Sequence, residues 1–111
     1  MDKELVLKKE SSNDGGTIYL FYDEFYSLYV AFGLSAYYST MVVDPHLTYS
    51  DELDMPVAMF SKALIRMMRQ GLRKVEHTPG SSYEFRTRIP LGRAGYDKWK
   101  KEVKNRHESI L

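Results

Sequence analysis

Four cationic side chains recur at helical spacing in the middle of this 111-residue sequence. They are Lys62, Arg66, Arg69 and Arg73, at positions i, i+4, i+7 and i+11. On one helix they would occupy a sector of about 60°, and no carboxylate lies between the first and the last of them. Such a stripe suits contacts with nucleic-acid phosphates, because each neutralised phosphate releases counterions. A solvated helix face is also rich in lysine and arginine, so both interpretations stay open.

Three further side chains would extend this surface. Ser61 lies near the start of the helix, from which it and Lys62 could reach base edges in a major groove about 12 Å wide. Arg86 and Arg88 lie on the second strand of a hairpin that we expect beside the helix. The predicted nucleic-acid-binding residues are therefore Ser61, Lys62, Arg66, Arg69, Arg73, Arg86 and Arg88.

An amphipathic helix over about residues 56–70 must position this stripe. Its apolar residues keep helical spacing, and they are Val57, Phe60, Ala63, Leu64, Met67 and Met68. Pro56 suits a first helical turn, and Asp54 can act as its cap. Gly71 stands where a left-handed residue commonly ends a helix.

Two elements are expected after this helix. Turn-forming residues over 78–82, including a Pro-Gly pair, separate two β-prone runs and predict a hairpin over about 73–90. A C-terminal helix is expected over about 96–105, because Tyr96, Trp99 and Val103 form an apolar seam there.

The first half of the chain gives weaker signals. Residues 4–9 alternate like a strand, and residues 17–22 are rich in β-branched and aromatic types, so the two segments predict an N-terminal β-hairpin. Residues 17–22 are apolar on both faces, which implies cover on both sides. Residues 25–43 fit a helix capped by Asp23, and they also fit strands; the spacing slightly favours the helix. A helix with two apolar faces would need a partner subunit.

These elements predict a single α+β domain over residues 1–111. The second half resembles the winged helix-turn-helix family over residues 47–105. The matching segments are 47–53 as the short helix, 54–56 as the turn, 57–70 as the recognition helix, Gly71-Leu72 as its ending and 73–90 as the wing. The resemblance implies a winged-helix-like fold, DNA binding and transcription regulation. Residues 91–95 and the helix after them are similar to the family segment that supports dimerisation, which implies a homodimer.

Charge is distributed unevenly along the chain. Residues 1–60 hold ten carboxylates and three lysines, whereas residues 61–111 hold thirteen Lys or Arg and five carboxylates. This asymmetry is typical of a protein with a polyanionic partner, and equally of two halves that attract each other within one fold.

An alternative function is that of a small inhibitor, such as an immunity protein, an antitoxin or a phage-type inhibitor, which occludes a protein partner. Its surface would combine tyrosines, which are enriched at interfaces, with acidic side chains. The acidic residues are Asp51, Glu52 and Asp54, and the tyrosines are Tyr19, Tyr22, Tyr26, Tyr29, Tyr37, Tyr38 and Tyr49.

Few residues indicate catalysis. The chain has no cysteine, which excludes disulfides and thiolate metal sites. His46, His77 and His107 lack metal-ligand spacing, and the glycines at 15–16 and 92–95 lack the pattern of phosphate-cradling loops. We therefore expect no enzymatic activity, metal or cofactor. Residues 25–43 are uncharged but polar and acid-flanked, so no membrane segment is expected, and a cytoplasmic location is the default.

Overall fold

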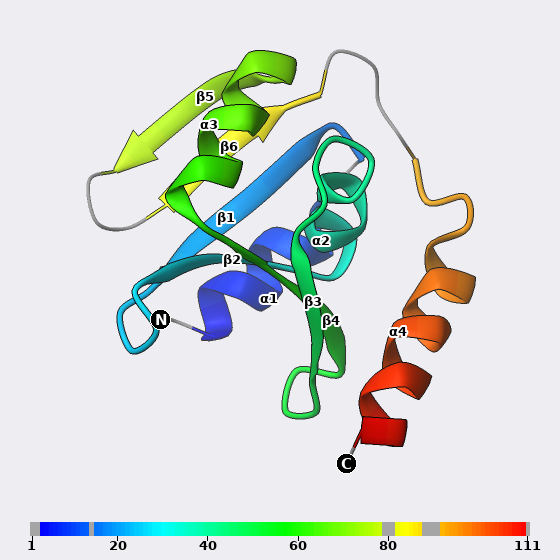
Figure 1. Cartoon of the computed structure of the whole chain (residues 1–111). Helices are drawn as coiled ribbons and strands as arrows, with labels where there is room; N and C mark the ends of the chain where they lie inside the picture. The colour runs from blue at the N-terminus through cyan, green and yellow to red at the C-terminus, as the bar shows by residue number, and fades with distance from the viewer. Residues whose placement is uncertain (1–2, 14, 79–81, 88–91, 111) are drawn as a thin grey trace.

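The structure, a computed structural model, describes residues 3–13, 15–78, 82–87 and 92–110, and for residues 73–78, 82 and 110 it describes the backbone alone. The chain is α+β, as predicted. Its elements are α1 (Lys3–Ser11), β1 (Thr17–Asp23), β2 (Leu28–Phe32), α2 (Gly33–Ser39), β3 (His46–Ser50), β4 (Met55–Phe60), α3 (Lys62–Gly71), β5 (Arg73–Thr78), β6 (Ser82–Arg86) and α4 (Tyr96–Ile110). The strands form a six-stranded antiparallel sheet in the order β3-β4-β2-β1-β6-β5 (Figure 1).

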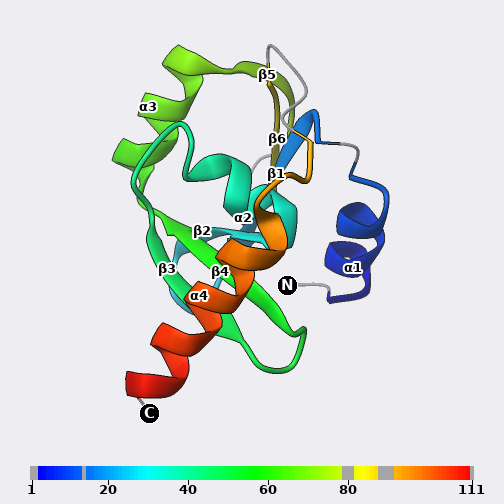
Figure 2. The ribbon, with the colours of Figure 1, turned by 90° about the vertical axis from the view of Figure 1, so that its right-hand side faces the viewer.

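Helices cover both faces of this sheet. Helix α1 lies against one face, and its buried Val6 belongs to an apolar cluster with Phe21, Val30, Phe32 and Val57. Helices α2, α3 and α4 lie on the opposite face (Figure 2), around a larger core that contains Ile18 and Leu20. The sheet is therefore a central layer between two helical layers.

Strand β1 occupies the middle of the sheet, between β2 and β6. Ile18 and Leu20 face the larger core, whereas Phe21 belongs to the cluster under α1 and Tyr19 packs against that cluster. The cover on both sides that the sequence predicts for residues 17–22 is confirmed.

The predicted N-terminal hairpin is wrong, because residues 4–9 belong to α1 and β1 pairs with β2 and β6 instead. Leu5 and Leu7, whose alternation suggested a strand, are 39% and 44% exposed. The buried residues of this segment are Val6 and Glu10, which stand four positions apart on one face of the helix. A single buried apolar residue leaves a weak periodic signal, so local composition was misleading here.

Residues 25–43 contain both a strand and a helix, so each alternative was correct for part of the segment. The chain turns over residues 24–27, forms β2 and then enters α2 directly. The change occurs at Gly33, whose φ of +56° is a left-handed conformation that glycine adopts without a steric penalty. No helix in the described part of the chain is long and apolar enough to cross a bilayer.

The helix predicted over residues 56–70 starts later than expected. Residues 55–60 form β4, which pairs with β3, and α3 begins only at Lys62. Asp54 is not its cap but a turn residue with φ +53°, and Pro56 lies in β4 opposite Tyr49. Ser61 is the cap, because its hydroxyl oxygen accepts a hydrogen bond from the Leu64 amide at 3.3 Å.

The short helix expected over residues 47–53 is also absent, because this segment is β3 and the turn after it. Tyr49 is buried on this strand and pairs with β4, so tertiary pairing overrides the weak helical pattern. The first helix of the winged-helix order is therefore missing. The hairpin after α3 is confirmed as β5 and β6, and the C-terminal helix begins at Tyr96 as predicted and continues to Ile110.

Candidate anion-binding site on helix α3

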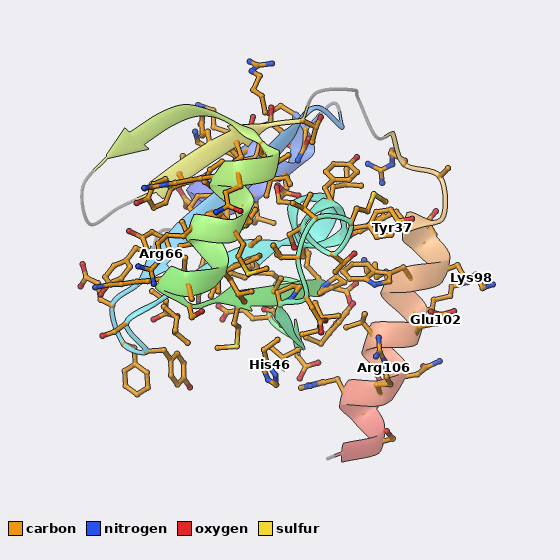
Figure 3. All side chains as sticks on the ribbon, turned by 45° about the horizontal axis from the view of Figure 1, so that its top comes forward. Tyr37, His46, Arg66, Lys98, Glu102 and Arg106 are labelled. Carbon is orange, nitrogen blue, oxygen red and sulfur yellow. The ribbon has the colours of Figure 1, made fainter. Side chains whose placement is uncertain are left out.

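Helix α3 presents its predicted cations on the side away from the core. Ile65 and Met68 are buried beneath the helix, 4% and 0% exposed. Lys62, Arg66 and Arg69 are exposed. Since residues four apart share a helix face, the first and second of these cations stand one above the other, and Arg66 projects from α3 in Figure 3.

These three cations line one cavity of about 240 Å³. Tyr29 of β2, Tyr83 of β6 and the buried Ile65 of α3 also line it. No carboxylate is found among the described lining residues. Three positive charges and two phenol groups therefore converge on a pocket that is suited to an anion.

Arg69 is held in place by Tyr83. Its Nη2 donates a hydrogen bond to Tyr83 Oη at 2.7 Å, and its guanidinium carbon lies 5.0 Å from the centre of the Tyr83 ring. The Tyr29 ring meets the Tyr83 ring edge-on with centroids 5.1 Å apart. This packing fixes one cation and both phenols before any ligand arrives, which lowers the entropic cost of binding.

The phenol of Tyr29 is a hydrogen-bond donor over the physiological pH range. Burial raises its pKa above the ordinary value of 10.0, and the neighbouring Tyr83 adds to this effect more than the positive charge of Arg69 opposes it. A hydrogen bond between the Tyr29 and Tyr83 side chains is one of the causes, so the two phenols form one hydrogen-bonded pair beside Arg69.

The other predicted site residues lie elsewhere or have another role. The Ser61 oxygen already caps α3, so the structure gives it a helix-stabilising role. Arg86 is exposed, but it shares a strand face with Glu84, which pairs with Lys9 of α1. Because Phe85 between them points into the larger core, Arg86 lies on the α1 side of the sheet and away from α3. Of the predicted cations whose side chains the structure describes, Arg86 therefore lies on the opposite side of the sheet from Lys62, Arg66 and Arg69.

Two of the predicted cations cannot be placed on this surface. The Arg73 backbone is part of β5, and its side chain lies outside the described residues. Arg88 also lies outside the described residues.

The sequence did not identify Tyr29 and Tyr83 as part of this pocket. Tyr83 lies in the second β-prone run of the predicted hairpin, and Tyr29 lies in the segment that fitted both a helix and strands. The signal that could have found them is a hydroxyl-bearing aromatic residue at an apolar strand position, since such a residue brings a polar end to the edge of a core.

Part of the acidic and tyrosine-rich surface of the alternative function makes contacts within the fold. Lys3 pairs with Glu52, Lys104 Nζ lies 3.6 Å from Asp54 Oδ1, and His107 Nε2 lies 3.6 Å from Asp51 Oδ2. The Lys104–Asp54 pair joins the basic second half of the chain to the acidic first half, in agreement with the interpretation that the two halves attract each other within one fold. Tyr38 and Tyr49 are buried at 0% and 5% exposure, so they belong to the core and not to a contact surface.

An exposed aromatic pair remains at the turn between β1 and β2. Phe25 is 85% exposed and Tyr26 is 61% exposed, with ring centroids 4.8 Å apart. Both backbone amides donate to Asp23 Oδ1, at 2.9 and 3.3 Å, so the turn presents the two rings in a defined conformation.

Within the described residues, no group of three or more His, Asp or Glu side chains is arranged to hold a metal ion. Comparison of the chain with protein-family models, curated proteins and solved structures finds no match.

Proposed function

We propose that this protein binds nucleic acid, with duplex DNA as its ligand, through the cationic pocket of α3. The observation that carries the proposal is the convergence of Lys62, Arg66 and Arg69 with two phenol hydroxyls around one cavity, with no carboxylate among its described lining residues. Phosphate groups are recognised by such sets of cations and hydroxyl donors.

Lys62 supports the proposal because local helix energetics disfavour it. It is the first residue of α3, and the first turn contains no acidic residue. The helix dipole places partial positive charge at this end, so a cation there costs about 0.3–1 kcal/mol. A residue that opposes a local preference is expected where function requires it, and phosphate binding supplies such a requirement.

Three phosphate contacts define the expected strength of salt dependence. Each contact contributes about −0.9 to the slope of log K against log salt, so three give about −2.7, or about a 40-fold loss of affinity between 50 and 200 mM salt. Two copies side by side on one duplex would give a slope of about −5.4. The homodimeric regulator that the winged-helix resemblance implies would show the steeper slope.

The test is fluorescence anisotropy with a labelled DNA duplex across this salt range. The double variant Lys62→Glu/Arg66→Glu should lose binding, whereas Arg69 is left unchanged because its guanidinium bonds to Tyr83. The matched control is Lys98→Glu, which changes another exposed cation, on α4 and on the other side of the molecule from Arg66 (Figure 3). A flat salt dependence of the wild-type protein, or equal losses in both variants, would overturn the proposal.

A second candidate function, contact with a protein partner, is favoured by the exposed Phe25–Tyr26 pair. Rigid aromatic side chains bring large contact area at low entropic cost. In this case the double variant Phe25→Ser/Tyr26→Ser should lose a partner that the wild type captures from nuclease-treated lysate of its source, and duplex binding should be unchanged. If the partner is retained by the variant, this second function is excluded for the turn.

A further inference from the structure

A second cavity, of about 550 Å³, lies between α1, the start of α2 and α4. Helices α1 and α4 flank α2 in Figure 2. Residues that line the cavity include Leu7 and Lys8 of α1, Gly33 of α2, Met55 of β4 and Tyr96 of α4. Its volume falls within the range of about 300–1,000 Å³ that small-molecule sites occupy. It shares no lining residue with the α3 pocket.

The hydroxyl of Tyr96 has no hydrogen-bond partner among the described residues, although the side chain is only 7% exposed. The ring is fixed by aromatic contacts with Tyr37 and Trp99, with centroids 5.8 and 6.2 Å away. Buried hydroxyl groups are normally hydrogen-bonded, and leaving one without a partner is unfavourable. A ligand atom in the cavity would supply the missing partner.

Glu10 does not fill this role, because its carboxylate is already engaged. Oε1 accepts from the Ser35 amide at 3.1 Å, and Oε2 accepts from Ser35 Oγ at 2.6 Å and from Asn13 Nδ2 at 3.4 Å. These bonds connect α1 to the start of α2. Glu10 thus closes one side of the cavity as a structural group and leaves Tyr96 free to bind something else.

Gly33 keeps the space beside the Tyr96 hydroxyl open. A Cβ atom at this position would lie 3.4 Å from Tyr96 Oη and 3.2 Å from Glu10 Oε1. The bare Cα therefore leaves room for a ligand atom at the hydroxyl. Burial and the nearby Glu10 charge raise the pKa of Tyr96 to about 12, so the hydroxyl keeps its proton and can donate it.

Three cationic side chains line the cavity. They are Lys8, Arg93 and Lys100; Lys100 Nζ lies 4.0 Å from Asp54 Oδ2, and the Arg93 guanidinium carbon lies 5.5 Å from the centre of the Tyr96 ring. One exposed carboxylate, Asp97, is also present. Apolar walls, one inner hydroxyl donor and these cations together specify the chemistry of the ligand.

We propose that this cavity binds a small organic anion, which places a neutral oxygen against Tyr96 Oη and a carboxylate among Lys8, Arg93 and Lys100. The apolar body of the ligand lies against Leu7, Leu34 and Met55. The proposal is independent of nucleic-acid binding at α3.

Three matched probes test this ligand chemistry by NMR titration of the full chain. They are 4-hydroxyphenylacetate, phenylacetate, which lacks the hydroxyl, and tyramine, which replaces the carboxylate by an ammonium group. We expect 4-hydroxyphenylacetate to bind about threefold to tenfold more tightly than phenylacetate, the effect of one neutral hydrogen bond, and more tightly than tyramine. Chemical shifts should change at Ser11, Gly33 and Leu34.

Two variants separate the roles of the hydroxyl and the charges. Tyr96→Phe removes the inner donor, keeps the ring and should abolish the preference for 4-hydroxyphenylacetate over phenylacetate. Because the hydroxyl has no described partner, this variant should fold with undiminished stability. Lys8→Gln should weaken both acids, whereas the matched control Lys101→Gln, exposed on α4 and not among the lining residues, should not.

Several results would overturn the proposal. The two acids could bind equally to the wild type, their difference could persist in Tyr96→Phe, or the shift changes could map to α3 instead. The absence of binding by all three probes at 10 mM, roughly the weakest range for a fragment of this size, would also overturn it.

Discussion

Replacing Lys62 by glutamate should raise stability while it weakens nucleic-acid binding. Lys62 is the first residue of α3, where a cation opposes the helix dipole, and glutamate would reverse the sign of this interaction. Removing the unfavourable charge and adding a favourable one should together contribute about 1 kcal/mol at this exposed position. For a chain of 111 residues, the entropy of unfolding is about 230 cal/mol/K, so the melting temperature should rise by about 4 °C.

The effect on binding has the opposite sign. One phosphate contact contributes about eightfold to affinity at 0.1 M salt, so Lys62→Gln should lose about this factor and reduce the salt slope by about 0.9. Lys62→Glu should lose more, because a carboxylate repels the phosphate. Lys62→Gln should raise the melting temperature by about 2 °C, half of the glutamate effect.

Calorimetry and anisotropy on the same three proteins measure both effects. A melting temperature that falls in Lys62→Glu would contradict the dipole reasoning, since the variant leaves the Ser61 cap in place. A melting temperature that rises while affinity stays constant would show that Lys62 does not contact the nucleic acid.

Three further predictions concern the groups around the two cavities. Ser61→Ala should lower the free energy of unfolding by about 1 kcal/mol, because it removes the cap of α3, and Ser61→Asn should restore it. If Ser61→Ala instead changes the salt dependence of DNA binding, Ser61 contacts the nucleic acid directly. Burial raises the pKa of Glu10 above 4.5, so the folded chain retains a proton that the unfolded chain releases. The free energy of unfolding should therefore fall as the pH rises above 4.5. Urea unfolding of Glu10→Gln over the same pH range should show a smaller fall. Gly33→Ala should destabilise by about 1–2 kcal/mol, since alanine is strained at a φ of +56°; an unchanged urea midpoint would mean that the backbone adjusts at no cost.

The elements that were predicted correctly carry local signals. The β5–β6 hairpin was predicted from a Pro-Gly pair in the sequence between two β-prone runs, and the start of α4 from an apolar seam beginning at Tyr96. The helix expected over 56–70 was half correct for a physical reason. Val57 and Phe60 match helical spacing, yet they lie in a strand that is covered on both faces, where periodicity does not distinguish strand from helix.

The sequence predicted the part of the candidate site that lies on a single helix, and not the part contributed by strands. Lys62, Arg66 and Arg69 converge because helical spacing alone fixes their relative positions. Arg86 was assigned to the same surface, but the face of a strand residue depends on which neighbour the strand pairs with, and β6 pairs with β1. Tyr29 and Tyr83 meet only because strands distant in sequence join one sheet, which no local pattern contains.

The central position of β1 has a consequence for the order of folding. This strand forms its second set of ladder bonds with β6, where Thr17 pairs with Arg86 across most of the chain length. During synthesis the β1–β2 hairpin therefore emerges long before β6. Until β6 is made, the edge of β1 that pairs with β6 has no neighbouring strand. Pairs this remote in sequence close slowly. The interval in which the edge is open is the stage at which the nascent chain is most exposed to mispairing with a second copy.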